Sequence, residues 1–138
     1  FDMSRVIFFF LLIFYSCQIF ESTEIIVISD AELTEIQDTD YILVDVRTRE
    51  EYESGHIKDA IHFDFYSELF QKEILSIDKS SSIVLYCRTQ NRSAKTANYL
   101  KENGYKEIAV LEGGISAWIK NGNDLVYNFT NEINSTEE

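Results

Sequence analysis

The stretch "SSIVLYCRTQNRSAKTANYLKENG", residues 81–104, passes from an apolar run through a cysteine and two arginines into a helical pattern. Residues 81–87 predict a buried strand, and residues 92–104 predict a helix that Gly104 closes at its C-terminus. A strand that leads directly into a helix is typical of parallel βαβ units. Because ligands of open α/β sheets bind at the carboxyl ends of the strands, Cys87 is expected at the functional edge of the sheet.

The same alternation continues in both directions along the chain. Further strands are predicted at residues 23–29, 41–46, 61–65 and 107–112. Helices or helical turns are predicted at residues 29–37, 49–55, 66–77 and 115–122, and in the third of these Leu69, Phe70 and Ile74 share one face. The expected fold class is α/β, an open parallel sheet of four or five strands with helices on both faces.

The two ends of the chain differ from the body. Residues 1–20 contain an apolar run after Arg5 that fits a signal peptide or lipoprotein signal and is shorter than the roughly 20 residues of a spanning helix. Export to the periplasm or cell envelope is therefore predicted, with Cys17 either removed or lipidated as the only membrane anchor. One folded domain is predicted over residues 21–127, and residues 128–138 predict a polar, acidic, disordered tail.

Charge and cysteine count narrow the function. Acidic residues outnumber basic ones 24 to 12, and the net charge of −12 argues against nucleic acid as a partner. Since Cys17 falls outside the folded domain, Cys87 has no disulfide partner within it. A free cysteine that ends a strand is most often a small buried hydrophobe. The clustering of Arg88 and Arg92 beside it, in a chain poor in cations, favours chemistry instead.

The loop after Cys87 suggests what that chemistry requires. A loop between a strand and a helix can turn successive backbone N–H groups inward as an anion-binding cup, and the helix N-terminus adds partial positive charge. Such a cup, with Arg88 and Arg92, would stabilise a thiolate. Cys87 is therefore predicted to be an activated nucleophile that is open to solvent.

Three motifs, in order, resemble those of the rhodanese (sulfurtransferase) family. They are "CRTQNRS" at residues 87–93, "ILVDVRTREEYESGHIKDAIHFDF" at residues 42–65, and "GYKEIAVLEGGISAWIKNG" at residues 104–122. The resemblance covers nearly the whole segment between the two chain ends. It identifies the predicted domain of residues 21–127 as a rhodanese domain.

The resemblance implies transfer of sulfane sulfur without a metal or organic cofactor. Cys87 would attack the outer sulfur of an anionic donor such as thiosulfate, hold it as a persulfide, and pass it to cyanide or a thiol. Arg92 would help to hold the anion, and Arg88 would attract it at the rim. The predicted substrate-binding residues are Arg88, Thr89, Gln90, Asn91, Arg92 and Ser93. A monomer is expected.

One loop position departs from the family, which often has glycine where this chain has Gln90. If the backbone has positive φ there, glutamine costs about 1 kcal/mol relative to glycine. The alternative is that Gln90 offers its amide to the substrate.

Other positions in the motifs are predicted to support the loop. Asp45 is expected to cap the turn after its strand, and Arg47 is expected to pair with Glu51 four residues on and to fix the loop beside the pocket. His56 is expected to make a structural hydrogen bond, and Trp118 to lie in the core. The carboxylates of "EEYE" are expected to form a solvated face.

Two other functions are compatible with the sequence. Phosphatases and arsenate reductases use a related fold with a Cys-x5-Arg loop, whereas this chain has Cys-x4-Arg and places Ser93 where that arginine would stand. The second alternative is a non-enzymatic rhodanese-like module that binds a partner or senses redox state.

Overall fold

The computed structural model describes residues 23–127, so the predictions for residues 1–20, including Cys17, and for residues 128–138 lie outside the described residues. Five parallel strands form one sheet in the order β1-β5-β4-β2-β3. The strands are β1 (Ile25–Ile28), β2 (Ile42–Asp45), β3 (Ile61–His62), β4 (Ile83–Tyr86) and β5 (Ile108–Leu111). The helices are α2 (Asp30–Glu35), α3 (Arg49–Glu53), α4 (Phe70–Ile74), α5 (Asn91–Glu102) and α6 (Gly114–Lys120).

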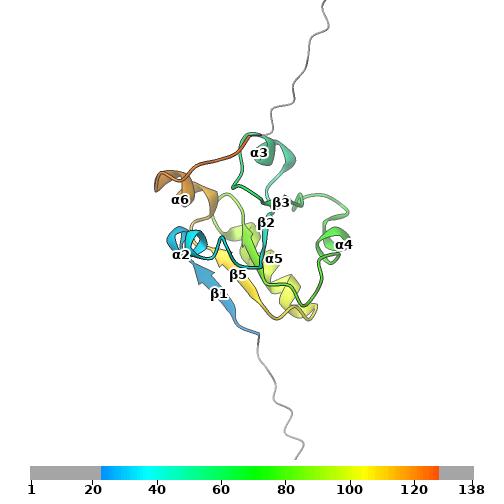
Figure 1. Cartoon of the computed structure of the whole chain (residues 1–138). Coiled ribbons are helices and arrows are strands. Elements are labelled where there is room, and N and C mark those ends of the chain that lie inside the picture. The colour runs from blue at the N-terminus through cyan, green and yellow to red at the C-terminus, as the bar shows by residue number, and fades with distance from the viewer. Residues whose placement is uncertain (1–22, 128–138) are drawn as a thin grey trace, which may run out of the picture.

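Helices cover both faces of the sheet, as Figure 1 shows, which confirms the predicted fold class. On one face, side chains of the central strands pack with Ile74 of α4 and Leu100 of α5. On the other face, the alternate side chains of the same strands pack with Leu33 of α2 and Trp118 of α6. Because successive side chains of a strand point to opposite faces, residues 83 and 85 lie on the α4–α5 face and residues 84 and 86 lie on the α2–α6 face.

The predicted helix over residues 66–77 is much shorter in the structure. Asp64 accepts a hydrogen bond from Tyr66 N through Oδ1, and Ser67 Oγ accepts one from Leu69 N. These side-chain bonds hold the backbone in turns, so α4 begins only at Phe70. The predicted shared face is wrong for Leu69, which is 57% exposed, whereas Phe70 and Ile74 are buried.

Helix α5 is the longest helix of the described chain, and it ends as predicted. Ala97 and Leu100 are fully buried against the sheet, and Gly104 follows the helix with φ of 89°. Ser93 and Thr96 are also buried on this face. Small side chains at these positions let the helix lie close to β4 and β5, which it contacts.

A C-terminal strap, residues 123–127, returns across the molecule after α6. Val126 forms an antiparallel bridge with His56, with backbone hydrogen bonds of 3.0 and 2.8 Å in the two directions. Trp118 is buried as predicted, and its Nε1 donates to the carbonyl oxygen of Asp124 at 2.8 Å. Leu125 packs against the α2–α6 core. The sequence did not predict this pairing.

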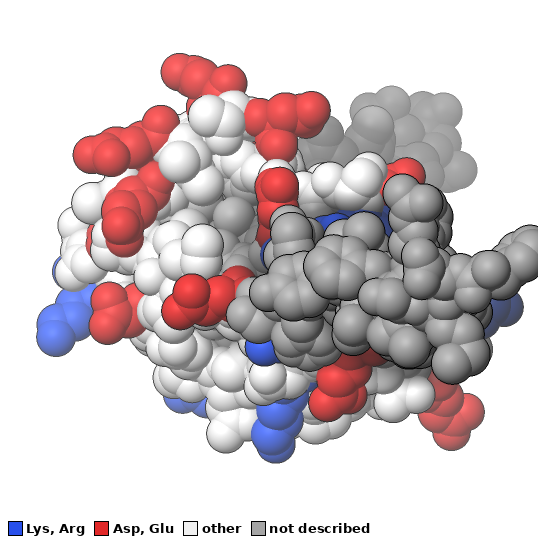
Figure 2. All heavy atoms as spheres, turned by 90° about the horizontal axis from the view of Figure 1, so that it is seen from below, with Lys and Arg blue, Asp and Glu red and all other residues white. Residues whose placement is uncertain are grey.

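Acidic side chains are prominent on one face of the molecule (Figure 2), in agreement with the charge balance of the sequence. Figure 2 shows one face of the molecule, over much of which Asp and Glu side chains stand out among the described residues. None of the helices within residues 23–127 is both long and apolar enough to cross a membrane.

Candidate active site

Cys87 follows β4 directly and points into the protein. Residues 83, 85 and 87 alternate toward the α4–α5 face, so the side chain of Cys87 joins the core on that side. Cys87 is 1% exposed, and its Sγ lies 3.5 Å from Ser93 Oγ. The prediction of a sulfur open to solvent is therefore wrong for this conformation, because the strand alternation turns the residue inward.

Backbone carbonyls of the loop after Cys87 are held by the helices on either side of it. The carbonyl oxygen of Cys87 accepts a hydrogen bond from Ile115 N at 2.9 Å, and that of Arg88 accepts one from Ser116 N at 3.0 Å. The carbonyl of Gln90 accepts from Ala94 N and from Ser93 Oγ. By contrast, the backbone N–H groups of residues 88–93 donate to no acceptor within residues 23–127. Free donors of this kind are typical of a loop that enters a helix.

Gly114, at the start of α6, makes this arrangement possible. Its φ is 58°, and a Cβ atom there would lie 2.4 Å from the carbonyl oxygen of Cys87 and 2.5 Å from that of Thr89. Only glycine fits such a close approach of two backbone segments. The paired glycines of the third motif therefore bring α6 against the loop.

Gln90 does not carry the strain considered for it. Its φ is −164°, which is extended backbone, and Asp59 is the only residue other than glycine with positive φ among residues 23–127. The side chain of Gln90 turns toward α6, where Oε1 accepts a hydrogen bond from Gly113 N at 3.4 Å. Glutamine thus adds a contact between the loop and α6.

The guanidinium of Arg92 is held by a carboxylate. Its Nη1 donates to Oε2 of Glu51 at 2.6 Å, and its Nη2 donates to Oε1 at 2.9 Å. The hydrogen bonds from Arg92 are the main cause that lowers the pKa of Glu51 to about 2. The ring of Tyr66 lies 5.7 Å from the guanidinium carbon. The role of Arg92 in holding a substrate anion stays a prediction, but its positive charge already has a partner.

The predicted pairing of Arg47 with Glu51 is wrong. Arg47 precedes Thr48, the N-cap of α3, so the two residues do not share a helical turn. Arg47 instead donates to both oxygens of Asp45 and to the carbonyl of Gly55. Both members of this ion pair are buried, with Nη2 of Arg47 2.7 Å from Oδ2 of Asp45.

Asp45 fixes the turn after β2, as predicted. Its Oδ1 also accepts a hydrogen bond from the backbone N–H of Arg47 at 2.9 Å. The turn lies beside the loop after Cys87, because Asp45 is paired in register with Tyr86 and Val46 N donates to the carbonyl of Tyr86. The Asp45–Arg47 pair therefore supports the neighbouring strand end.

The sequence predicted two settings for Glu51, an ion pair with Arg47 and a place on a solvated face, and missed its actual partner, Arg92. Glu51 lies at the third position of α3 and bonds back to the N-cap residue, with Thr48 N donating to Oε2 at 2.9 Å. The sequence "TREE" carries this signal, because threonine followed three residues later by glutamate is a capping box. The partner across the fold, Arg92, leaves no such local trace.

Both histidines flank Tyr52. The rings of His56 and His62 stack on Tyr52 with centroids 3.8 and 4.7 Å away. His56 Nδ1 lies 3.1 Å from the carbonyl oxygen of Tyr52, which confirms the predicted structural hydrogen bond. His62 Nε2 lies 2.8 Å from the carbonyl oxygen of Arg47.

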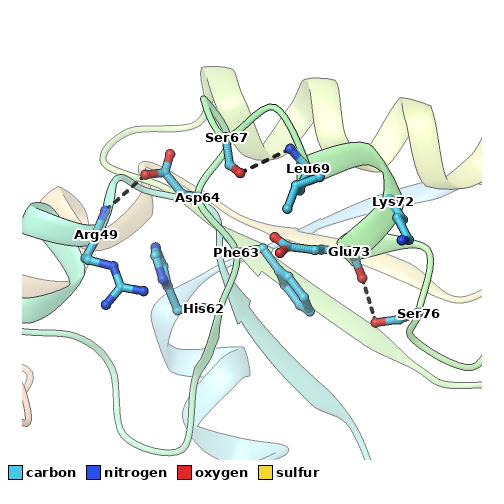
Figure 3. A pocket seen from close by; sticks show the side chains of 9 residues that line it. All are labelled: Arg49, His62, Phe63, Asp64, Ser67, Leu69, Lys72, Glu73 and Ser76. Carbon is cyan, nitrogen blue, oxygen red and sulfur yellow. Dashed lines mark hydrogen bonds between the residues drawn. The ribbon is translucent and has the colours of Figure 1, made fainter.

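The remaining residues of the loop after Cys87 lie at the protein surface. Arg88, Thr89 and Asn91 are exposed, so the loop presents one arginine to solvent and keeps the other paired with Glu51. A separate cavity of about 630 Å³ opens between β3 and α4, lined by residues such as Arg49, His62 and Lys72 (Figure 3). None of the predicted site residues lines it. No group of three potential metal-ligating side chains lies within residues 23–127.

A family model, described as the Rhodanese-like domain, matches residues 29–121. The chain belongs to the rhodanese family. The loop after Cys87, the Asp45–Arg47 turn and the paired glycines all fall within the matched residues. The family resemblance inferred from the three motifs is therefore confirmed.

Relatives of this rhodanese-like chain include proteins of two activities. A protein of Allochromatium vinosum described as a sulfurtransferase is 37% identical over 87 residues, which are 63% of this chain and 79% of that protein. A tRNA uridine(34) hydroxylase of Hamiltonella defensa is 36% identical over 91 residues, which are 62% of this chain. The match spans only a quarter of the hydroxylase, 25% of its length.

Solved structures agree with the family. A rhodanese-related protein of Thermoplasma volcanium is 31% identical with a TM-score of 0.65, and the match covers 73% of this chain and 97% of that one. A rhodanese-like domain protein of Staphylococcus aureus is also 31% identical, with a TM-score of 0.63 and coverage of 75% and 98%.

Proposed function

We propose that this protein is a sulfurtransferase that moves sulfane sulfur from an anionic donor to a thiol or cyanide through a persulfide on Cys87. The observation that carries the proposal is the loop of residues 88–93, whose backbone N–H groups have no acceptor within the described chain. The similarity to the Allochromatium vinosum sulfurtransferase supports the same activity.

The chemistry consists of two displacements. The thiolate of Cys87 attacks the outer sulfur of the donor, a new S–S bond forms, and the donor's own bond to that sulfur breaks with its electron pair on the leaving group, which is sulfite when the donor is thiosulfate. The acceptor then attacks the outer sulfur of the persulfide, and the electron pair of the broken S–S bond returns to Cys87. No oxidant or reductant is consumed.

The residues around Cys87 have separate parts in this scheme. The free N–H groups of the loop stabilise the anionic persulfide and the departing anion, as in other oxyanion sites. Ser93 Oγ, 3.5 Å from the sulfur, offers a further polar contact. Arg88 attracts the anion at the exposed rim. Because Cys87 is 1% exposed, turnover also requires side chains above the sulfur to move aside.

That burial also favours a second candidate, a rhodanese-like module that binds a partner without catalysis. In this case Cys87 serves as a core residue and the loop as a rigid surface. The two candidates differ in one measurable property, namely whether sulfur becomes attached to Cys87.

Intact mass spectrometry distinguishes them. After incubation with an excess of thiosulfate or of an alkyl persulfide, a sulfurtransferase gains the mass of one sulfur atom and loses it again when cyanide is added. The variant Cys87→Ser, whose hydroxyl is a close match in size, is the control and gains nothing. Absence of the added sulfur with both donors would leave the binding module as the function.

The location of the protein is also a proposal. The apolar run of residues 6–14 favours export, with the domain retained in the periplasm or cell envelope. Fractionation of cells that express the full chain, followed by mass analysis of the mature N-terminus, tests export and shows whether Cys17 is removed or lipidated.

A further inference from the structure

Glu51 neutralises the positive charge of Arg92 in the loop after Cys87. Its carboxylate binds Arg92 through two hydrogen bonds of 2.6 and 2.9 Å, and the exposed fractions of the two side chains are 29% and 14%. A paired, two-point contact between a guanidinium and a carboxylate is one of the stronger polar contacts in proteins. Arg92 therefore adds little net charge to the site.

Two further contacts keep this pair in place. Thr48 N donates to Oε2 of Glu51 at 2.9 Å, so the carboxylate is fixed to the start of α3. The ring of Tyr66 lies over the guanidinium of Arg92 at 5.7 Å. Releasing Arg92 toward a substrate would break the paired hydrogen bonds and leave Glu51 without its counter-charge.

The charge that remains for a donor is small. Backbone N–H groups carry only partial positive charge, and Arg88 lies exposed at the rim, where solvent screens it. Cys87 is buried, so the donor's outer sulfur must enter a poorly solvated space. Transfer of an ion out of water becomes more costly as its charge increases. Such a site disfavours thiosulfate, a dianion, more than it disfavours a donor with one charge.

We propose that Glu51 is a specificity-determining residue that, by neutralising Arg92, makes singly charged alkyl persulfides better sulfur donors than thiosulfate. This inference rests on the proposed function. In the corresponding step the Cys87 thiolate attacks the outer sulfur of the persulfide anion R–S–S⁻, and that sulfur, with its negative charge, becomes the outer sulfur of a Cys87 persulfide. The bond between the two donor sulfurs breaks, its electron pair leaves with RS⁻, and RS⁻ takes a proton from solvent.

The test compares two donors on the full chain. Values of kcat/KM are measured for thiosulfate and for the persulfide of mercaptoethanol, with the same thiol acceptor. In Glu51→Gln the charge of Arg92 is freed while the side chain keeps its size. We expect the ratio of kcat/KM for thiosulfate to that for the persulfide to rise about tenfold.

The matched control is Glu50→Gln, which removes the same charge from the neighbouring position of α3 without touching Arg92. Its ratio is expected to stay within about twofold of the original, since exposed charges are largely screened. The double variant Glu51→Gln/Arg92→Gln carries a neutral pair and is expected to return to the original ratio. An unchanged ratio in Glu51→Gln, or an equal rise in Glu50→Gln, would overturn the proposal.

A second measurement uses the unmodified protein and so does not depend on the folding of a variant. Inhibition of persulfide turnover is compared for sulfate, a dianion, and thiocyanate, a monoanion, at equal ionic strength. Weaker inhibition by sulfate supports the proposal, and tighter inhibition by sulfate contradicts it. Failure of both donors to place sulfur on Cys87 is a different result, which would contradict the proposed function itself.

Discussion

Gly114 and Gly122 are two residues with positive φ, 58° and 83°, that differ in what surrounds them. A Cβ on Gly114 would lie 2.4 Å from the carbonyl oxygen of Cys87 and 2.5 Å from that of Thr89, whereas a Cβ on Gly122 would meet nothing within 4 Å. Alanine substitutions at these two glycines therefore distinguish the cost of backbone strain, which both share, from the cost of a steric clash, which only Gly114 has.

We expect Gly114→Ala to lower the free energy of unfolding by about 3 kcal/mol, since strain and overpacking add. Gly122→Ala is expected to cost about 1 kcal/mol from strain alone. Urea denaturation measures both. Sulfur loading of Cys87 should fall in Gly114→Ala, because the carbonyls that α6 holds are displaced. Equal losses of stability in the two variants would contradict this account of the loop.

At the scale of the element, α3 links stability to pH through Glu51. The folded-state pKa of Glu51 is lowered from 4.5 to about 2, mainly by Arg92, so the folded protein binds fewer protons than the unfolded chain in that interval. The stabilisation is present above pH 4.5 and is lost as the pH falls toward 2.

Between pH 4.5 and about 2, we expect the free energy of unfolding to fall by on the order of 1 kcal/mol more in the original protein than in Glu51→Gln. The difference is small because the ion pair is partly exposed to solvent. Denaturant titrations at several pH values measure the difference, and comparison with the variant cancels the contributions of other carboxylates. Identical pH dependence in the two proteins would show that the ion pair does not contribute to folding.

Elements were predicted well where their signals are local. The strands β2 and β4 are apolar runs, and α5 has both its apolar stripe and its closing glycine in the sequence. The helix predicted over residues 66–77 is shorter in the structure because the side chains of Asp64 and Ser67 accept hydrogen bonds from Tyr66 N and Leu69 N and hold these residues in turns. The pairing of the C-terminal strap was not predicted because the bridge between Val126 and His56 joins segments that are far apart in the sequence.

The candidate site follows the same division. The place of Cys87 at a strand end and the loop that follows it were evident from the sequence. Cys87 is buried because its side chain lies on the face of the sheet that α4 and α5 cover. The packing of these two helices cannot be deduced from the local sequence. The partners of Glu51 and Arg47 were likewise set by the fold, since each bonds to a residue on another segment.

At the scale of the whole molecule, the net charge of −12 opposes the approach of anionic donors. Raising the salt concentration from about 10 to about 150 mM shortens the Debye length from about 30 to about 8 Å. We therefore expect kcat/KM for thiosulfate to rise about threefold, and that for a singly charged persulfide to rise less. Initial-rate measurements in potassium chloride test this. A fall in kcat/KM with salt would mean that cations such as Arg88 outweigh the net charge.

The strap also matters for anyone who wishes to produce the domain by itself. The match to the family model ends at residue 121, yet Val126 pairs with His56 and the carbonyl of Asp124 accepts a hydrogen bond from the indole N–H of Trp118. A fragment trimmed to the boundary of similarity would strip the indole N–H of its acceptor and uncover Gly55, whose carbonyl holds Arg47. The recombinant boundary should therefore be set at or beyond residue 127.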